Sequence, residues 1–251
     1  MSSRTRKLQL HGAGPNKVRQ EGSHPHQVVL LDETDELLIP DLGTDQVRRL
    51  KKISDGTWIQ HSHISYELGG GPRHVAYHGV FPRQIMMVKP LTSVNQMASS
   101  LRFLNSRTNL FDTRYPSRPV FPSSLPRLQQ YPALPLNLML AAEILITKPN
   151  SSFPTPYIYI SNRNDPSPHG DSLSIFDFTS SSSQPELIAE VRTGLSHVRG
   201  ILFGGLDDKY LVAGGVNGGG VKIFERTDGG RRLKEVARNE FVSAPTGFLW
   251  K

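Results

Sequence analysis

The sequence predicts an all-β fold, an incomplete β-propeller of four-stranded antiparallel blades. A short phrase with one polar residue followed by apolar ones opens at His26, Arg73, Arg199 and Thr246. The first two openings and the last two are each 47 residues apart, a period typical of propeller blades. Between them, short apolar runs alternate with Asp-, Gly- and Thr-rich turns, which favours antiparallel strands over helices.

The predicted strands follow the same order in two copies of the repeat. After an extended lead-in over 1–25, the first copy places strands at 26–31, 36–40 and 46–53. The last copy places them at 199–203, 209–213 and 221–226. Superimposing the two copies aligns Leu37–Ile39 with Tyr210–Val212 almost without gaps, and this internal match is the strongest argument for the fold.

Two further copies bring the number of blade starts to about four of seven. One consists of apolar runs at 142–146, 157–161 and 172–178. The copy that opens at Arg73 has no clear second strand, although one is expected at roughly 83–90. The propeller is therefore predicted over 26–251.

The glycine run Gly214–Gly220 admits two interpretations. A phosphate-binding loop needs a helix amino terminus directly after the glycines. Here the strand-like stretch Val221–Glu225 follows instead. We therefore predict a tight hairpin whose backbone requires positive φ angles.

Composition and chain length limit the classes of protein. The 251 residues are 37% hydrophobic, enough for a sizeable core. No apolar run approaches the ~18 residues of a membrane span, and the basic amino terminus lacks the apolar core of a secretory signal. The absence of cysteine excludes disulfides, thiolate zinc sites and cysteine nucleophiles. We expect a cytoplasmic protein that does not associate with membranes.

The net charge of +7 is concentrated in one segment. Between Val80 and Ala142 lie seven basic residues and a single acidic one, Asp112, among many prolines. Nucleic-acid surfaces combine basic residues with a folded reader or interleaved aromatic residues, and neither is evident here. We predict an irregular Arg/Pro-rich segment over 80–137 and no nucleic-acid partner.

The repeat also selects candidate functional residues. Equivalent positions on the innermost strands of a propeller surround one central channel. His26, Arg73 and Arg199 should therefore converge on a small anionic ligand. Arginine holds carboxylate or phosphate oxygens in bidentate fashion, and a histidine orients a substrate or transfers a proton. The alternative is that these polar residues only fill a water-lined channel.

Metal and triad sites are not expected. The pairs His24/His26 and His61/His63 have i, i+2 spacing, which places both side chains on one face of a strand. No third ligand stands at a spacing that fixes a metal geometry. The sequence also lacks the Gly-x-Ser-x-Gly elbow of a serine triad. We predict no metal and no cofactor.

Longer stretches resemble a known family. They read SHPHQVVLLDETDELLIPDLGTDQV, GGGPRHVAYH, PYIYISNRNDPSPHGDSLSIF and HVRGILFGGLDDKYLVAGG. Covering about 15–79 and 138–250, these stretches resemble the lactonase family of seven-bladed β-propellers. That family includes 6-phosphogluconolactonases and carboxy-cis,cis-muconate cyclases, and the closest resemblance is to fungal isomerase-like members.

The resemblance implies a lactone-forming or lactone-hydrolysing enzyme without a metal. Its implied partner is a small anionic substrate, either a carboxylate or a phosphosugar lactone. By motif, the catalytic residues implied are His26 in HPHQ, Arg73 in GPRH and Arg199 in HVRG. These are the three positions that the internal repeat also selects.

Two departures from the family favour an alternative, a non-catalytic propeller remnant or a scaffold or binding module. The family's catalytic glutamate is expected near Lys89, but no glutamate occurs between Glu67 and Glu143. Glu143 follows Ala142, the position aligned with His26, so its side chain is expected to face away from the channel.

Length is the second departure, because seven blades need over ~300 residues. We expect about three amino-terminal blades to be missing and Thr246–Trp250 to start an incomplete blade. The exposed blade edges would then favour self-association.

Overall fold

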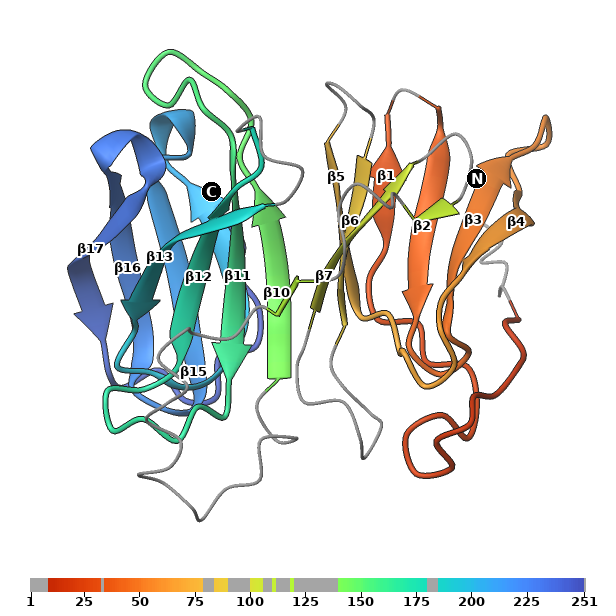
Figure 1. Cartoon of the computed structure of the whole chain (residues 1–251), viewed down its shortest axis with the longest axis horizontal. Helices are drawn as coiled ribbons and strands as arrows, with labels where there is room; N and C mark the ends of the chain where they lie inside the picture. The colour runs from red at the N-terminus through yellow and green to blue at the C-terminus, as the bar shows by residue number, and fades with distance from the viewer. Residues whose placement is uncertain are drawn as a thin grey trace, which may run out of the picture.

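The computed structural model describes residues 9–32, 34–78, 84–89, 100–105, 110–111, 118–119, 140–179 and 185–250. Their strands form four antiparallel sheets that stand side by side as blades (Figure 1). In three of these sheets the strands pair in sequence order, and in the fourth only β9 departs from it by pairing with β7. The described residues thus confirm the predicted all-β propeller architecture.

The first blade consists of β1 (Val29–Leu31), β2 (Glu36–Asp41), β3 (Gln46–Lys52) and β4 (Trp58–Ser65). The predicted second and third strands are confirmed within one residue. The first is shorter than predicted, because upstream of β1 the pairing with β2 is reduced to an isolated bridge, Pro25 to Asp41. Two backbone hydrogen bonds flank it, from His26 N to Pro40 O (3.0 Å) and from Leu42 N to His24 O (3.1 Å). His26 therefore lies in the segment that leads into β1 and is only partly paired with β2.

The second blade consists of β5 (His74–His78), β6 (Gln84–Lys89) and β7 (Ser100–Asn105), with the short strands β8 (Leu110–Phe111) and β9 (Arg118–Pro119) both pairing with β7. The strand expected at roughly 83–90 is thus present as β6. Most of the predicted irregular segment over 80–137 lies outside the described residues.

Each of the other two blades has four strands of at least six residues. The third consists of β10 (Leu140–Ile146), β11 (Tyr157–Arg163), β12 (Ser172–Asp177) and β13 (Glu186–Arg192). The fourth consists of β14 (Ser196–Gly204), β15 (Tyr210–Gly218), β16 (Gly220–Thr227) and β17 (Arg232–Asn239). The predicted hairpin joins β15 to β16, and its glycines have positive φ, +84° at Gly219 and +66° at Gly220.

The carboxyl-terminal prediction of a strand over Thr246–Trp250 is wrong. In the part of the chain that the structure describes, residues 241–250 form no strand. The segment instead lies against β14 and β15, where two glycines leave room for it: a Cβ on Gly200 would come within 2.8 Å of Thr246 O, and one on Gly214 within 2.8 Å of Phe248. The close contact with these glycines takes the place of sheet pairing.

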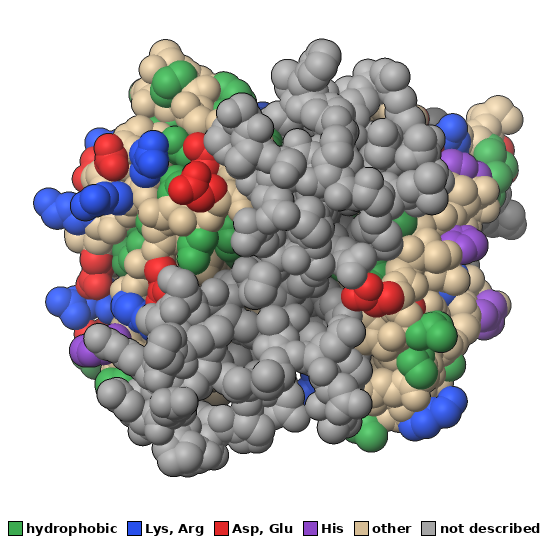
Figure 2. Space-filling view, viewed as in Figure 1, with side chains coloured by type: hydrophobic (Ala, Val, Ile, Leu, Met, Phe, Trp, Pro, Cys, Tyr) green, Lys and Arg blue, Asp and Glu red, His purple; other side chains and the backbone are tan. Residues whose placement is uncertain are grey.

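The outer strand of the fourth blade is protected by charge. Its side chains form ion pairs such as Lys222 to Glu235 (3.1 Å) and Arg238 to Glu235 (3.3 Å). Figure 2 shows acidic and basic side chains interspersed over this blade, at the left of the view. Charged side chains on an exposed edge discourage pairing with another strand.

The largest core cluster lies between the third and fourth blades. Tyr159 and Ile175 of the third blade pack with Leu211 and Phe224 of the fourth, and all four are almost completely buried. A second cluster joins the first two blades. Apolar side chains of adjacent sheets thus hold the blades face to face and fix the inner strands relative to one another.

Leu211→Ala should lower the free energy of unfolding by about 2–5 kcal/mol, because it leaves a cavity between two blades. Urea denaturation followed by circular dichroism measures this change. Leu206→Ala is the matched control, since Leu206 is 86% exposed and should change the free energy by less than about 0.5 kcal/mol. Equal losses in the two variants would contradict the assigned core.

Candidate active site

The structure brings His26 and Arg73 together although they are 47 residues apart. Arg73 Nε donates a hydrogen bond to His26 Nε2 at 3.3 Å. Burial, followed by the charge of Arg73, lowers the pKa of His26 to about 3. His26 is therefore neutral at physiological pH and acts as a hydrogen-bond acceptor toward Arg73.

Arg73 is a buried cation with unused hydrogen-bonding capacity. It is 2% exposed, and its Nη1 has no hydrogen-bond partner among the described residues. Burial, then the charges of Arg163 and Arg199, lowers its pKa to about 9. The charge of Arg199 also lowers the pKa of His26, so the three predicted residues belong to one electrostatic cluster.

Arg163, at the end of β11, is a third arginine of this cluster, one that the repeat does not single out. Burial and then Arg199 lower its pKa to about 10, and its buried Nε has no hydrogen-bond partner in the described part of the chain. The strand was predicted to end at Ser161. Continuing the i, i+2 alternation from Ser161 by one step would have found Arg163.

His197, two residues before Arg199, is another missed member. Its Nδ1 lies 2.7 Å from Asn164 Oδ1, next to Arg163. Burial, then Arg163 and Arg199, lowers its pKa. Its φ of +60° is unusual for a residue with a side chain, so the surrounding contacts hold it in place.

Glu143 points toward this cluster, and the expectation that it faces away is wrong. Its Oε1 lies 2.8 Å from His74 Nδ1. The physical reason is a register shift between Ala141 and Ile144 in the pairing of β10 with β11. Such a β-bulge inserts an extra residue and so re-aims the side chains within it.

His74 connects Glu143 to the predicted residues. Its ring packs edge-on against the ring of His26, with centroids 4.9 Å apart. Burial lowers the pKa of His74, and the carboxylate of Glu143 opposes this effect. Glu143, His74, His26 and Arg73 therefore form a continuous series of contacts across three blades.

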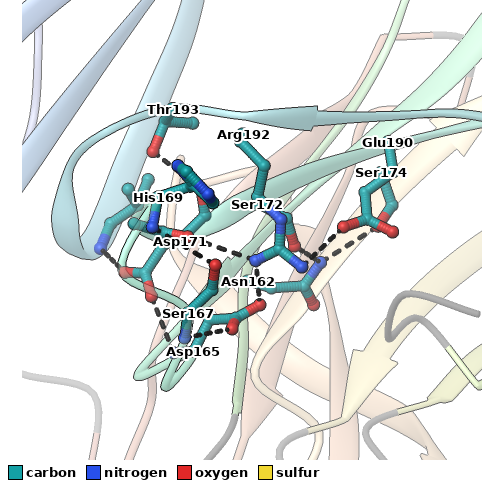
Figure 3. Close-up of polar contacts among 12 residues, drawn as sticks. Asn162, Asp165, Ser167, His169, Asp171, Ser172, Ser174, Glu190, Arg192 and Thr193 are labelled. Atoms are coloured by element: carbon teal, nitrogen blue, oxygen red, sulfur yellow. Dashed lines mark hydrogen bonds and ion pairs between the residues drawn. The ribbon is translucent and has the colours of Figure 1, made fainter. Parts of the chain in front are cut away.

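A buried carboxylate positions the segment that carries His197 and Arg199. Asp171, just before β12, accepts hydrogen bonds from the backbone N–H of Asp165 and of Val198, each at 2.8 Å. Val198 stands between the two site residues. Burial, opposed by these hydrogen bonds, raises the pKa of Asp171 to about 6. Figure 3 shows the network around Asp171.

The end of β11, with Arg163, and the loop that follows it, with Asn164, are held by further polar contacts (Figure 3). Arg192 forms ion pairs with Asp165 and with Glu190, the latter at 2.8 Å. Asn162 Nδ2 donates to Ser174 Oγ at 3.0 Å. The loop is thus tied to both β12 and β13, which limits the movement of Arg163 and Asn164.

The first blade uses an aspartate in the same position. Asp45 directly precedes β3 as Asp171 precedes β12, and it accepts hydrogen bonds from the backbone N–H of Gly69 and Gly71, each at 2.7 Å. These glycines lead to Arg73. In both cases, therefore, an aspartate of one blade accepts hydrogen bonds from the backbone segment that leads to the arginine of the next blade.

Residues of the lead-in before β1 also interact with the groups that position the arginine cluster. Gln20 is fully buried, and its Nε2 donates to Asp45 Oδ1 at 2.7 Å. The charge of the neighbouring Arg19 lowers the pKa of Arg163. The lead-in thus adds positive potential near the arginine cluster.

The two His-x-His pairs form other contacts. His24 Nε2 lies 3.0 Å from Glu21 Oε1, and His61 Nε2 lies 3.0 Å from Glu36 Oε1. Among the residues that the structure describes, no group of three His, Cys, Asp or Glu side chains could hold a metal ion. Nor does any described helix have the length and apolar character needed to cross a membrane.

A family model described as lactonase, 7-bladed β-propeller, matches residues 1–250. The chain belongs to this lactonase family. The match also runs through 80–137, a segment outside the stretches that carry the resemblance. The family resemblance inferred from the blade motifs is confirmed.

Individual relatives support the same assignment. The 6-phosphogluconolactonase of Bacillus subtilis is 24% identical over 218 residues, which are 86% of this chain and 53% of the relative. A relative from Arthroderma benhamiae is 24% identical over 219 residues, 86% of this chain and 50% of its own. This lactonase-family chain thus spans about half the length of these curated relatives.

Solved structures show the fold. A protein from Lactobacillus plantarum superimposes with a TM-score of 0.70 at 20% identity, covering 97% of this chain and 62% of the other. The periplasmic gluconolactonase of Pseudomonas aeruginosa does so with a TM-score of 0.69 at 15% identity, covering 95% and 60%. At these identities the likeness establishes the propeller fold of this lactonase-family chain and nothing finer.

Proposed function

We propose that this chain hydrolyses a small anionic lactone, with 6-phosphogluconolactone as the substrate to test first. The observation that carries the proposal is the cluster of Arg73, Arg163 and Arg199: the charges of Arg163 and Arg199 lower the pKa of Arg73, and the charge of Arg199 lowers the pKa of Arg163. A buried cation beside two half-buried ones is unfavourable without a counter-ion, and a phosphate or carboxylate would supply one. The name of the Bacillus subtilis relative supports the choice of substrate.

Each site residue has a role in this proposal. Arg199 and Arg163 hold the anionic group of the substrate, and Arg73 faces the lactone carbonyl. The Nη1 of Arg73 has no partner among the described residues, so it is available for the oxyanion that develops during hydrolysis. His26, neutral because its pKa is about 3, orients Arg73.

A binding module without turnover is the second candidate. It is favoured by the absence of a glutamate between Glu67 and Glu143, since the family resemblance places a catalytic glutamate near Lys89. The same arginine cluster would then bind a sugar phosphate or a dicarboxylate reversibly. Lactone formation of the muconate-cyclase type would use the same cluster in the reverse direction.

Turnover of 6-phosphogluconolactone by the purified chain tests the proposal directly. Release of 6-phosphogluconate is measured with a coupled dehydrogenase and corrected for spontaneous hydrolysis. Arg199→Ala should lower kcat/KM by about 10²-fold, because a charge-assisted contact to the anion is lost. Arg238→Ala, at a side chain that is 60% exposed, should leave it unchanged.

Two other outcomes separate the candidates. Binding of 6-phosphogluconate by the chain, without turnover of the lactone, would establish the binding module. Equal kcat/KM for Arg199→Ala and the unsubstituted chain would overturn the role of the arginine cluster.

We also propose a cytoplasmic location and self-association. The absence of cysteine fits a reducing compartment, and cell fractionation tests the location. Val28 and Leu30 of the first blade are 62% and 50% exposed, an apolar edge that a second copy would cover. Light scattering after size-exclusion chromatography should give a mass above that of one chain.

A further inference from the structure

Glu143 and His74 form a carboxylate–imidazole pair between the second and third blades. Glu143 Oε1 is 2.8 Å from His74 Nδ1, and the two side chains are only 18% and 8% exposed. The β-bulge in β10 aims the carboxylate at this ring. Bulges are often found where a functional side chain is re-aimed.

The carboxylate determines which nitrogen of His74 carries the proton. A carboxylate next to Nδ1 favours the tautomer with the proton on Nδ1, which leaves a lone pair on Nε2. Both ring nitrogens of His74 are buried. Nδ1 lies at ion-pair distance from Glu143 Oε1, 2.8 Å, without the alignment of a hydrogen bond, and Nε2 has no hydrogen-bond partner among the described residues. Burial also lowers the pKa of His74, so this nitrogen stays unprotonated at neutral pH and can accept a proton.

The surroundings of His74 suit a reaction at an anionic substrate. Arg73 precedes His74 in the chain, and the positive charges of Arg73 and Arg163 both lower the pKa of His74. The ring of His26 packs against it. A proton acceptor therefore stands beside the groups assigned to anion binding, while the position near Lys89 supplies no carboxylate.

We propose that Glu143 and His74 are the proton-transfer pair of this site, with His74 as the general base and Glu143 as the residue that orients it. The proposal rests on the proposed lactone hydrolysis. It assigns to Glu143 the carboxylate function that the family resemblance places near Lys89.

The reaction balances with water as the second substrate. The water oxygen forms a bond to the lactone carbonyl carbon, one water proton moves to His74 Nε2, and the carbonyl electron pair becomes an oxyanion held by Arg73. The carbonyl then re-forms, the bond to the ring oxygen breaks, and His74 returns the proton to that oxygen. The product is the hydroxy acid, and His74 is neutral again.

Kinetics of Glu143→Gln provide the first test. The kcat for 6-phosphogluconolactone should fall by about 10²-fold or more, because the glutamine no longer favours the reactive tautomer. The KM should stay within about threefold, because the arginines still hold the substrate. Glu235→Gln is the matched control and should leave kcat unchanged. It removes a carboxylate on the distant strand β17 that forms an ion pair with Lys222.

The histidine tautomer provides a readout that does not depend on turnover. Long-range ¹H–¹⁵N NMR spectra of the histidine-labelled chain identify the protonated nitrogen, and His74→Asn assigns the signal. The proton should be on Nδ1 of His74 in the unsubstituted chain and redistribute toward Nε2 in Glu143→Gln. Glu143→Asp, which keeps the charge, should retain the tautomer and part of the activity.

The outcomes separate this proposal from the proposed function. An Nε2–H tautomer in an active chain, or an unchanged kcat in Glu143→Gln, would overturn the pair and leave lactone hydrolysis standing. No hydrolysis by the unsubstituted chain would overturn both. A folded Glu143→Gln protein that has lost kcat and its Nδ1–H signal supports the pair.

Discussion

Arg73→Ala should reduce kcat/KM for lactone hydrolysis by about 10³-fold while leaving the chain folded. The loss follows from the removal of a donor to the developing oxyanion, an effect of about 10²–10³ in comparable sites. The substitution also removes the hydrogen bond that Arg73 Nε donates to the ring of His26 at 3.3 Å, which adds to the loss of activity. Steady-state kinetics with 6-phosphogluconolactone measure the change.

Thermal denaturation distinguishes this loss from unfolding. Arg73 is a buried cation whose pKa is lowered by burial and by two neighbouring arginines. Removing Arg73 relieves that repulsion, and this gain in stability offsets part of the loss caused by the cavity. The Tm without ligand should therefore change by only a few degrees. Stability and activity are often opposed at a binding site in this way.

Arg73→Lys and Arg232→Ala complete the series. Lysine keeps the charge but not the planar donor fork, so it should restore binding better than turnover. Arg232 is 77% exposed on β17 and serves as the neutral control. If Arg73→Ala lost activity only in proportion to its unfolded fraction, the oxyanion role would be wrong.

The sequence predicted those parts of the site that follow from the repeat itself. A repeat aligns equivalent positions of successive blades, and equivalent positions meet around the axis. For this reason His26 and Arg73, 47 residues apart, are found in contact. The hairpin at Gly219 was predictable for a local reason, because positive φ is a property of glycine.

Other parts depend on structure that a repeat does not encode. The orientation of Glu143 was predicted from strict alternation, and a single register shift in β10 reverses that inference. Thr246–Trp250 has a strand-like sequence, but glycines of β14 and β15 draw it into close contact without sheet pairing. Tertiary context overrides the local pattern in both cases.

Asp171→Asn should weaken substrate binding and change how stability depends on pH. Asp171 accepts backbone N–H groups with both carboxylate oxygens, from Asp165 and from Val198. Asparagine has one acceptor oxygen, and its amide group would face the other N–H as a second donor. The start of β14 should shift, and with it Arg199, so that KM rises by about tenfold, the result of losing about 1.4 kcal/mol of binding free energy.

The pH dependence follows from the pKa of about 6 that burial gives to Asp171. The unfolded chain has an ordinary aspartate pKa near ~3.9, so between about pH 4 and 6 the folded state binds more protons. The contribution of this group to stability is therefore largest below about pH 4 and declines as pH rises toward 6. Over that window the free energy of unfolding should fall by about 2–3 kcal/mol relative to Asp171→Asn, which has no proton to exchange.

Urea denaturation of both proteins at pH 4.5, 5.5 and 7 measures the difference. Asp177→Asn is the matched control, because within the described part of the chain the carboxylate of Asp177, at the end of β12, accepts hydrogen bonds only from Thr179 in an exposed turn. A pH-independent difference between Asp171→Asn and the unsubstituted chain would contradict the raised pKa. An unchanged KM would contradict the view that this carboxylate positions Arg199, because the hydrogen bond to Val198 is the link between them.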